Sequence, residues 1–252
     1  MSDPASAARK DDGAVRVALV TGGSRGIGRG IAGALLGDGW TVELCGRTKE
    51  SVEAAVEALA KAHGARVHGT AVDVRDASAV ATWVQEAHGR HGHVDALVNN
   101  AGLGAFGPID AIGVDTFRSV IETNLFGCFH TIAAVAPRMR AQGHGWIVNV
   151  GSLAARNAFA GGAAYNASKF GLLGLSEAAM LDLRHAGIRV TTVLPGSVDT
   201  ELRVRLPGDV EADRSWMLQV EDVARAVLDL LRYPDRALPS LLELRPSRPP
   251  QR

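Results

Sequence analysis

The chain has 252 residues, of which 46% are hydrophobic, and this length suits a single α/β domain with a large buried core. Lysine and arginine together number 27, and so do aspartate and glutamate, so there is no overall basic field to attract nucleic acid or an anionic membrane. No apolar run reaches the roughly 18 residues that a membrane span needs, and the start of the chain lacks the apolar core of a signal peptide. We therefore expect a small-molecule ligand, with no nucleic-acid and no membrane partner.

The two cysteines, Cys45 and Cys128, lie in apolar stretches and lack the spacing typical of a disulfide or a metal site. We therefore expect two buried, reduced thiols and a cytoplasmic protein. Residues 1–14 are polar and charged without periodicity, and residues 246–252 are rich in proline, so both segments are expected to be disordered tails. The residues between them, 15–245, are expected to form a single domain.

Short runs rich in β-branched residues alternate with longer segments whose apolar residues recur every three to four positions. The runs predict strands at Val15–Val20, Trp40–Cys45, Val67–Val72, Val94–Val98, Trp146–Val150 and Ile188–Leu194. The longer segments predict helices at Gly28–Leu36, Lys49–Ala62, Ser78–His88, Thr116–Arg140, Tyr165–His185 and Val220–Arg232. Because neighbouring parallel strands need crossover helices, this alternation predicts an α/β fold with a doubly wound parallel sheet of the Rossmann type, in three α/β/α layers. Ligands of such sheets bind at the carboxyl ends of the strands.

A glycine-rich turn joins the first predicted strand to the first predicted helix. Residues 21–28 read Thr-Gly-Gly-Ser-Arg-Gly-Ile-Gly, in which Gly22 permits a tight turn. Gly26 and Gly28 let the backbone approach a pyrophosphate and let the helix pack closely on the sheet. The helix N-terminus would offer that anion unpaired N–H groups and a positive dipole end. Glycine-rich turns also occur without a ligand, so it is the position after the first strand that predicts a dinucleotide site. The expected contacts are Gly22, Ser24, Arg25, Gly26, Ile27 and Gly28.

The second predicted strand ends at Gly46 and Arg47, where an NAD site usually has an acid that holds the ribose 2′-hydroxyl. A guanidinium favours a 2′-phosphate, which a carboxylate would repel, so we predict NADP(H) as the cofactor, with Arg25 as a second positive charge. The alternative is that both arginines are merely solvated. Glu43 lies too early in the strand to serve as the acid.

Two further strand ends are expected to line the cofactor. Asp73 and Val74 follow the third strand, where a carboxylate and a backbone amide could face the adenine, although Asp73 could equally cap the next helix. After the fourth strand come Asn99, Asn100, Ala101 and Gly102, a group of amides and small residues. The residues could also simply form an Asx-type turn, and the two interpretations are compatible. One asparagine would then hold the backbone of the turn, while the other lines the cofactor site.

Tyr165 and Lys169 are four residues apart in a predicted helix, so their side chains share one face. The chain has only two tyrosines and four lysines, which makes a chance pair at this spacing an event of about 3%. A tyrosine can protonate the alkoxide formed when a ketone is reduced and accept the proton in reverse, and a nearby ammonium stabilises the phenolate. Ser152 follows the fifth strand and could bind the substrate carbonyl, although taken singly it is better explained as a helix or turn cap.

These motifs resemble, in order and spacing, those of the short-chain dehydrogenase/reductase family over about residues 15–200. The resemblance rests on Thr21-Gly22, Gly26, Gly28, Asn99 to Gly102, Asn124, Ser152, Tyr165, Lys169 and Pro195-Gly196. It implies that Ser152, Tyr165 and Lys169 are catalytic together with Asn124, which would shape a helix kink and hold a water in a proton relay to the lysine. It also implies that Pro195, Gly196, Val198 and Thr200 form the loop over the nicotinamide.

The members that the sequence most resembles reduce 3-oxoacyl thioesters and related ketones, and they commonly end in a glycine-rich strand signature. Residues 238–252 lack that signature and end in a proline-rich tail, which leaves the acyl-chain substrate and the tetramer geometry open. The residues expected beside the reacting carbon are Leu153, Ala154, Asn157, Phe159 and a lid at about residues 196–218. We expect an uncharged ketone or secondary alcohol as substrate, and a homodimer or homotetramer.

The sequence thus predicts an NADP(H)-dependent oxidoreductase that transfers a hydride between nicotinamide and a ketone or secondary alcohol, with Tyr165 as general acid/base. The alternative from another class is a catalytically silent dinucleotide-binding regulatory protein of the same fold. A sugar-nucleotide epimerase or dehydratase shares the Tyr–Lys pair, but the glycine spacing and the lack of a sizeable C-terminal substrate domain disfavour it. His91, His93 and His144 lie in glycine-rich turns without ligand spacing, so we expect surface histidines and no metal site.

Overall fold

The computed structural model describes residues 15–200 and 213–250, and the statements below concern those residues. Seven strands pair side by side, all parallel, in the order β3-β2-β1-β4-β5-β6-β7. They are β1 (Val17–Thr21), β2 (Thr41–Gly46), β3 (Val67–Ala71), β4 (Ala96–Asn99), β5 (Gly145–Val150), β6 (Ile188–Pro195) and β7 (Leu241–Leu244). The first six lie within about two residues of the predicted strands, which confirms the expected α/β fold.

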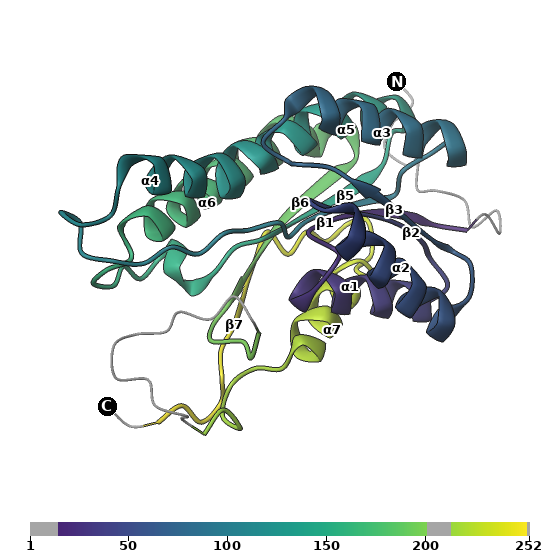
Figure 1. Ribbon diagram of the computed structural model, residues 1–252. Helices are drawn as coiled ribbons and strands as arrows, with labels where there is room; N and C mark the ends of the chain where they lie inside the picture. The colour runs from purple at the N-terminus through teal and green to yellow at the C-terminus, as the bar shows by residue number, and fades with distance from the viewer. Residues whose placement is uncertain (1–14, 201–212, 251–252) are drawn as a thin grey trace.

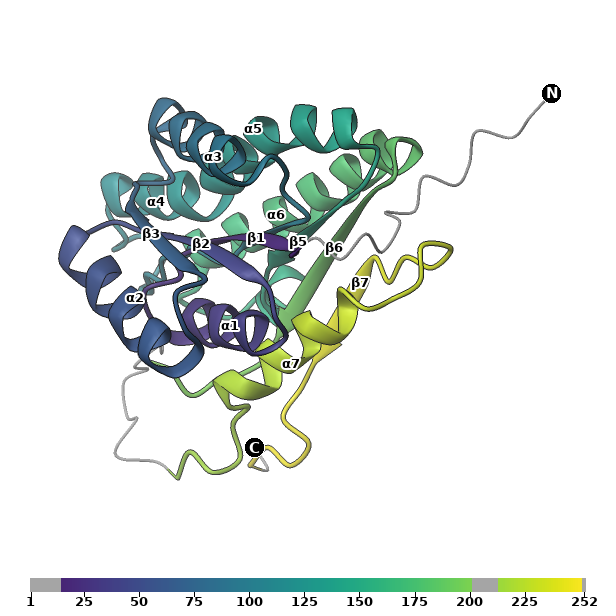
Figure 2. The ribbon, with the colours of Figure 1, turned by 90° about the vertical axis from the view of Figure 1, so that its right-hand side faces the viewer.

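Helices cover both faces of this sheet, as Figure 1 and Figure 2 show. The helices are α1 (Gly26–Gly37), α2 (Lys49–His63), α3 (Ala77–His91), α4 (Val114–Ile121), α5 (Gly127–Gln142), α6 (Ala163–Leu183) and α7 (Val220–Leu230). Short helical turns are η1 (Glu122–Phe126), η2 (Leu153–Ala155) and η3 (Arg184–Ala186). Helices α1, α2 and α7 lie on one face, and α3 to α6 lie on the other, so the fold has three layers.

The alternation of side chains along the strands produces two cores. In β1, Ala18 and Val20 point to the α1, α2 and α7 layer, whereas Leu19 points to the opposite layer. Both faces of the central strands are therefore buried, which is why these strands read as continuous apolar runs in the sequence.

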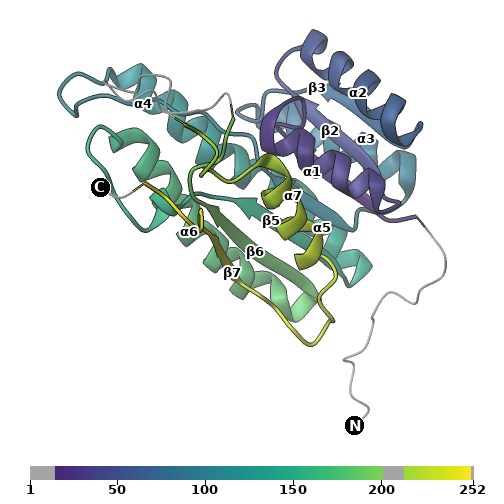
Figure 3. The same cartoon turned by 90° about the horizontal axis from the view of Figure 1, so that it is seen from below.

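The order of the strands places a binding crevice at one point of the sheet. From β1 the chain winds outward to β2 and β3, then returns to pair β4 with the other side of β1. The crossovers on the two sides of this point leave a gap beyond the carboxyl ends of β1 and β4, where open α/β sheets bind ligands. In Figure 3, β2 and β3 lie on one side of the sheet, next to α2, and β6 and β7 lie on the other.

Helices α4 and α5 join through η1 into one stretch, Val114–Gln142, that is long and apolar enough, by length and composition, to cross a membrane. The sequence expectation that no such segment exists is therefore too strict. Within its most apolar window 44% of the residues are buried in the domain, and Ile132, Val135 and Met139 belong to the core beneath the sheet. We interpret the stretch as a core helix.

The C-terminal region differs from the sequence expectation. Residues 238–252 carry no glycine-rich strand signature, yet Leu241–Leu244 form β7 and pair in parallel with β6. The first residue of the expected proline-rich tail, Pro246, lies against Gly196: a Cβ added to Gly196 would lie 2.9 Å from its Cδ. The described part of the chain extends past residue 245 to residue 250, whereas residues 1–14, 251 and 252 of the expected tails lie outside it.

Candidate dinucleotide pocket and catalytic groups

The turn after β1 is fixed by hydrogen bonds to the end of β4. The hydroxyl of Thr21 accepts the backbone N–H groups of Asn100 and Ala101, both at 3.0 Å. In return the Asn100 side-chain amide donates to the carbonyls of Thr21 and Gly22, at 3.1 and 3.2 Å. Gly22 has φ of 62°, which favours glycine, and an added Cβ would lie 2.8 Å from the Ala101 Cα. The two strand ends therefore hold the turn in one shape.

Gly28 lets the first turn of α1 lie against this loop. A Cβ at Gly28 would lie 2.2 Å from the carbonyl oxygen of Gly22 and 2.4 Å from the Asn100 Nδ2. Of the two roles that the sequence suggested for this glycine, the structure supports close packing, since Gly28 does not line the pocket described next. No residue larger than glycine fits here without moving the turn.

A pocket opens beyond the carboxyl ends of β1 to β4, at the point where the strand order reverses. It brings together twelve of the residues expected to contact the cofactor: Gly22, Ser24, Arg25, Gly26, Ile27, Arg47, Asp73, Val74, Asn100, Ala101, Gly102 and Thr200. Its lining also includes residues that were not among the expected contacts: Cys45, Gly46, Val72, Leu103 and Thr123. Gly46, Val72, Leu103 and Thr123 each adjoin an expected site residue in the sequence, so their positions could have indicated them.

Two arginines give the pocket a basic character, one in the glycine turn and one directly after β2. Arg25 and Arg47 both line it, and both are exposed. The one carboxylate among the described lining residues, Asp73, forms an ion pair with Arg75 in which Nη2 and Oδ2 are 2.6 Å apart. Hydrogen bonding from Arg75, with a smaller contribution from the charge of Arg47, holds the pKa of Asp73 below its usual value. The negative charge of Asp73 is thus already balanced by the guanidinium of Arg75.

Asp73 does not cap α3, which had been one interpretation of it. The N-cap of that helix is Asp76, whose carboxylate accepts the backbone N–H groups of Ser78 and Ala79 at 2.8 and 3.0 Å. Glu43, which lies too early in β2 to serve as the ribose acid, is buried and outside the pocket lining.

The two asparagines at the end of β4 do not divide their roles as expected. Asn100 both braces the glycine turn and lines the pocket. Asn99 is 1% exposed and lies below the pocket, where its side-chain amide donates to the Asn149 Oδ1 at 2.8 Å and its Oδ1 accepts the Thr131 hydroxyl at 2.6 Å. It therefore links β4 to β5 and α5.

Tyr165 and Lys169 share one face of α6, as their spacing predicts. The Lys169 Nζ lies 5.7 Å from the centre of the Tyr165 ring and donates to the carbonyl of Val150 at 3.1 Å. Lys169 is 5% exposed, so its ammonium is held in a buried position next to the tyrosine. The ring of Phe106 lies 5.4 Å from that of Tyr165 and was not anticipated.

Ser152 lies directly after β5 and caps the short turn η2. Its hydroxyl oxygen accepts the backbone N–H of Ala154 at 3.2 Å, which bears out the cap interpretation. Since a hydroxyl that accepts one hydrogen bond can still donate its own proton, capping and contact with a substrate carbonyl are compatible.

Asn124 occupies a π-helical turn, η1, between α4 and α5. Its Oδ1 accepts the backbone N–H of Leu103 at 2.7 Å, and its Nδ2 donates to the Leu103 carbonyl and to the Ser168 hydroxyl, each at 2.9 Å. Extra residues in a helical turn of this kind often occur at functional sites. The side chain, which is 1% exposed, thereby ties the pocket loop to the residue before Lys169.

The remaining expected site residues lie outside the pocket lining, among them Tyr165, Lys169, Pro195, Gly196 and Val198. Pro195 ends β6, and the backbone N–H of Gly196 donates to the Leu244 carbonyl at 2.8 Å. Val198 forms an isolated parallel bridge with Leu218. The expected lid, residues 196–218, is described only at its ends, because residues 201–212 lie outside the described part of the chain.

On the expected substrate side, Phe159 is 39% exposed and its ring lies 6.0 Å from that of Phe106. Asn157 donates to the Leu153 carbonyl, and Ala154 is buried. The described side chains next to Tyr165 are therefore mainly apolar and aromatic.

The expected surface position of His91 is wrong. It lies in the last turn of α3 with a side chain only 15% exposed, and its Nε2 is 2.7 Å from the Glu43 Oε1. His93 and His144 instead approach Asp95, at 3.3 and 4.0 Å. The sequence could not reveal the contact to Glu43, because 48 residues separate the two side chains.

Comparison with known proteins gives consistent matches. The family described as short chain dehydrogenase matches residues 16–210. The chain is 34% identical over 220 residues to the 3-oxoacyl-[acyl-carrier-protein] reductase of Chlamydia pneumoniae, covering 84% of this chain and 88% of that protein. A metagenomic short-chain oxidoreductase solved in complex with NADP has a TM-score of 0.80 and 35% identity, covering 93% of this chain and 98% of that one. An NAD⁺-bound xylitol dehydrogenase has a TM-score of 0.83 and 27% identity, covering 91% and 97%.

Proposed function

Because the chain belongs to the short-chain dehydrogenase/reductase family and is an oxidoreductase of the nicotinamide-dependent kind, we propose that it is an NADP(H)-dependent carbonyl reductase. The substrate is an uncharged ketone, or the corresponding secondary alcohol in the reverse direction, and Tyr165 is the general acid/base. The observation that carries the proposal is the placement of Tyr165 beside a buried Lys169 on α6.

The pocket suits a dinucleotide. Gly22 and Gly28 keep side chains away from the turn where a pyrophosphate would approach the first N–H groups of α1, and larger residues would collide with neighbouring backbone. Arg25, Arg47, Asn100 and Thr200 supply polar groups to the lining. When bound, the nicotinamide supplies the hydride for reduction or accepts it in oxidation.

The preference for NADP(H) over NAD(H) rests on Arg47, assisted by Arg25. Both line the pocket, the end of β2 carries no carboxylate, and the one acid in the lining, Asp73, is paired with Arg75. A guanidinium binds a 2′-phosphate through charge-assisted hydrogen bonds, which contribute about 1.5–3 kcal/mol. Since one similar structure holds NADP and another NAD⁺, the fold accommodates either cofactor and the preference has to come from such residues.

The cofactor preference is tested with Arg47→Asp. We expect Kd for NADPH, measured by fluorescence titration, to rise roughly 10- to 100-fold, while Kd for NADH falls or stays the same. The control is Arg118→Asp, because Arg118 is an exposed arginine of α4 outside the pocket. Unchanged NADPH affinity in Arg47→Asp would contradict the proposed preference.

The proton steps are assigned to residues of this chain. In ketone reduction the Tyr165 hydroxyl gives its proton to the carbonyl oxygen as negative charge develops there. The ammonium of Lys169, held beside the ring by the Val150 carbonyl, favours the phenolate that results. The Ser152 hydroxyl, fixed at the end of β5 by its bond from Ala154, donates to the same carbonyl oxygen and orients it.

The substrate side favours an apolar ketone. Phe106 and Phe159 form an aromatic cluster that reaches the Tyr165 ring. Such a surface contributes to binding through burial of apolar area and offers no cation to a carboxylate. Arg214, an arginine of the expected lid, is paired with Asp199 at 3.0 Å.

The mechanism is tested with Tyr165→Phe and a matched control, Tyr233→Phe. The chain has two tyrosines, and Tyr233 follows α7 with a half-exposed side chain. We expect Tyr165→Phe to lose turnover of NADPH over a panel of ketones, acyl thioesters and quinones while it retains NADPH binding, and Tyr233→Phe to retain both. A fully active Tyr165→Phe would refute the mechanism, whereas NADPH binding without turnover by the unmodified protein would favour a catalytically silent dinucleotide-binding protein.

We also propose that the protein is a homodimer or homotetramer. Support comes from aromatic side chains left exposed on the α4 to α6 layer, among them Phe126, Phe129 and Phe170, each about half exposed. Sedimentation analysis should give a mass above that of one chain, and Phe129→Glu should lower it. A monomer at micromolar concentration would contradict this proposal.

A further inference from the structure

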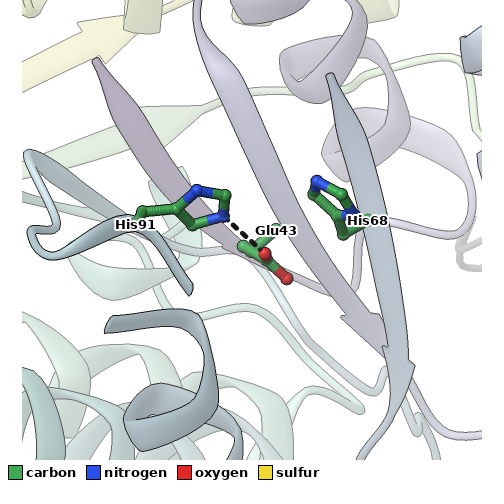
Figure 4. A group of neighbouring side chains, drawn as sticks. All are labelled: Glu43, His68 and His91. Atoms are coloured by element: carbon green, nitrogen blue, oxygen red, sulfur yellow. Dashed lines mark hydrogen bonds and ion pairs between the residues drawn. The ribbon is translucent and has the colours of Figure 1, made fainter. Parts of the chain in front are cut away.

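A carboxylate and two imidazoles meet at the outer part of the sheet, away from the dinucleotide pocket. Glu43 of β2 and His68 of β3 are register partners, so their side chains lie on the same face of the sheet. His91 ends α3, which covers that face. Figure 4 shows Glu43 between the two rings, with His91 on one side and His68 on the other.

The Glu43 carboxylate is buried and only half satisfied. Its side chain is 1% exposed. The Oε1 atom is paired with the Arg90 guanidinium and lies 2.7 Å from the His91 Nε2. Within the described part of the chain, Oε2 has no hydrogen-bond partner. A buried carboxylate oxygen without a partner is costly, which points to a further group at this position.

The donor set matches that of a transition-metal ion. One ligand atom from each of Glu43, His68 and His91 lies within 4.8 Å of the others. A tetrahedral zinc ion with bonds of about 2.0–2.2 Å separates its ligand atoms by roughly 3.3–3.6 Å, so movements of the ligand atoms by about 1 Å would suffice. Two imidazoles and one carboxylate are ligands that Zn²⁺ prefers, and a water can take the fourth position.

The helix terminus at this position favours a cation, whereas the Arg90 guanidinium paired with Glu43 opposes one. The site lies at the C-terminus of α3, the negative end of the helix dipole. Arg90 and His91 both contact Oε1, and within the described residues Oε2 has no partner, so hydrogen bonding orients the carboxylate and leaves Oε2 available, as for carboxylates in metal sites. The other imidazole pair, His93 and His144, offers less, because the nearby Asp95 already accepts the backbone N–H of Val17 at 2.7 Å.

We propose that Glu43, His68 and His91 bind a divalent transition-metal ion, of which Zn²⁺ suits the donors best. The ion bonds to Oε2 of Glu43 and to one nitrogen of each imidazole, and it replaces the hydrogen bond between His91 and Glu43. It would tie the edge strand β3 to β2 and to the end of α3. The site is structural and takes no part in hydride transfer.

The experiment uses the full chain without a polyhistidine tag, freed of metal by a chelator and dialysis. Zn²⁺ is titrated against a chromophoric competitor, and Co²⁺ is titrated to record the absorption bands of its coordinated form. The variants are His68→Gln and His91→Gln. The matched control is His185→Gln, because His185 is an exposed histidine on η3. NADPH binding and circular dichroism, measured on every preparation, report whether each variant is folded.

We expect one tightly bound Zn²⁺ per chain in the unmodified protein and in His185→Gln, and at least roughly 100-fold weaker binding in His68→Gln and His91→Gln. At a hundredfold excess of free Zn²⁺ over Kd, Tm should rise by about 5–10 °C in the unmodified protein. Binding that is absent, or equal in all variants, would overturn the proposal. Because these readouts need no substrate, the outcome is independent of the reductase proposal.

Discussion

Replacement of Gly28 by alanine tests whether the shape of the glycine turn is set by packing. The added Cβ would lie 2.2 Å from the Gly22 carbonyl oxygen, whereas real Cβ atoms essentially never approach closer than 3.0 Å. The turn and α1 must therefore separate by at least 0.8 Å, the difference between these two distances. The Asn100 amide, 2.4 Å from the new atom, must also move, and we expect it to lose its hydrogen bond to the Gly22 carbonyl.

The magnitude follows from three effects. Overpacking costs about 1–3 kcal/mol, and the lost hydrogen bond costs about 1 kcal/mol. The greater helix propensity of alanine returns about 0.5–1 kcal/mol. The free energy of unfolding should therefore fall by about 1–3 kcal/mol, which lowers Tm by roughly 2–12 °C for a domain of this size. Since the N–H groups of the turn are displaced, Kd for NADPH should rise roughly 10- to 100-fold.

Thermal unfolding and fluorescence titration with NADPH measure both effects. The control is Gly89→Ala in α3, where an added Cβ meets no atom within 4 Å and should raise the free energy of unfolding by up to about 1 kcal/mol. If Gly28→Ala unfolded within a degree of the unmodified protein and bound NADPH equally well, close packing at this turn would not be what the glycine provides.

Asn124→Ala removes three hydrogen bonds and leaves buried backbone groups unpaired, so chemical denaturation should show a free energy of unfolding lower by about 2–4 kcal/mol; a loss below about 0.5 kcal/mol would contradict this. Burial raises the pKa of the Cys45 thiol to about 12 and that of Cys128 to about 11, so a thiol reagent at pH 8 should modify neither before unfolding and both after it. The lowered pKa of Asp73 means that its pair with Arg75 stabilises the fold above the ordinary value of 3.8, and this contribution is lost as pH falls through the lowered value. Asp73→Asn should therefore lower the free energy of unfolding at pH 7 by up to about 1 kcal/mol, with a difference that vanishes in acid; an equal difference at every pH would contradict the sign.

The sequence predicts the layers and most of the pocket because local patterns carry that information. Strand and helix periods are local, and parallel strands bring their carboxyl ends to one edge, so Gly22, Arg47 and Asn100 could be placed together without coordinates. β7 was not predicted, because its four residues, Leu241–Leu244, are too few to show a strand pattern and form a strand by pairing with β6.

Side chains that meet through register were beyond sequence reasoning. Glu43 and His68 are partners because β2 pairs with β3 in one particular register, and a shift of one residue would have moved them to opposite faces. Phe106 likewise reaches Tyr165 through a loop whose path no motif specifies. The capping bond of Ser152 shows the converse, since a local role could be foreseen from its position after β5.

The two outermost strands, β3 and β7, form the two edges of the sheet. Each has at most five residues. β3 contains His68, and β7 contains Glu243, which is followed by Arg245 and Pro246. Edge strands this short, with a charged residue or a proline in or beside them, discourage a second sheet from pairing with the first. We therefore expect assembly of this protein to proceed through its helical faces, and fibrous strand-to-strand association to be suppressed even at high concentration.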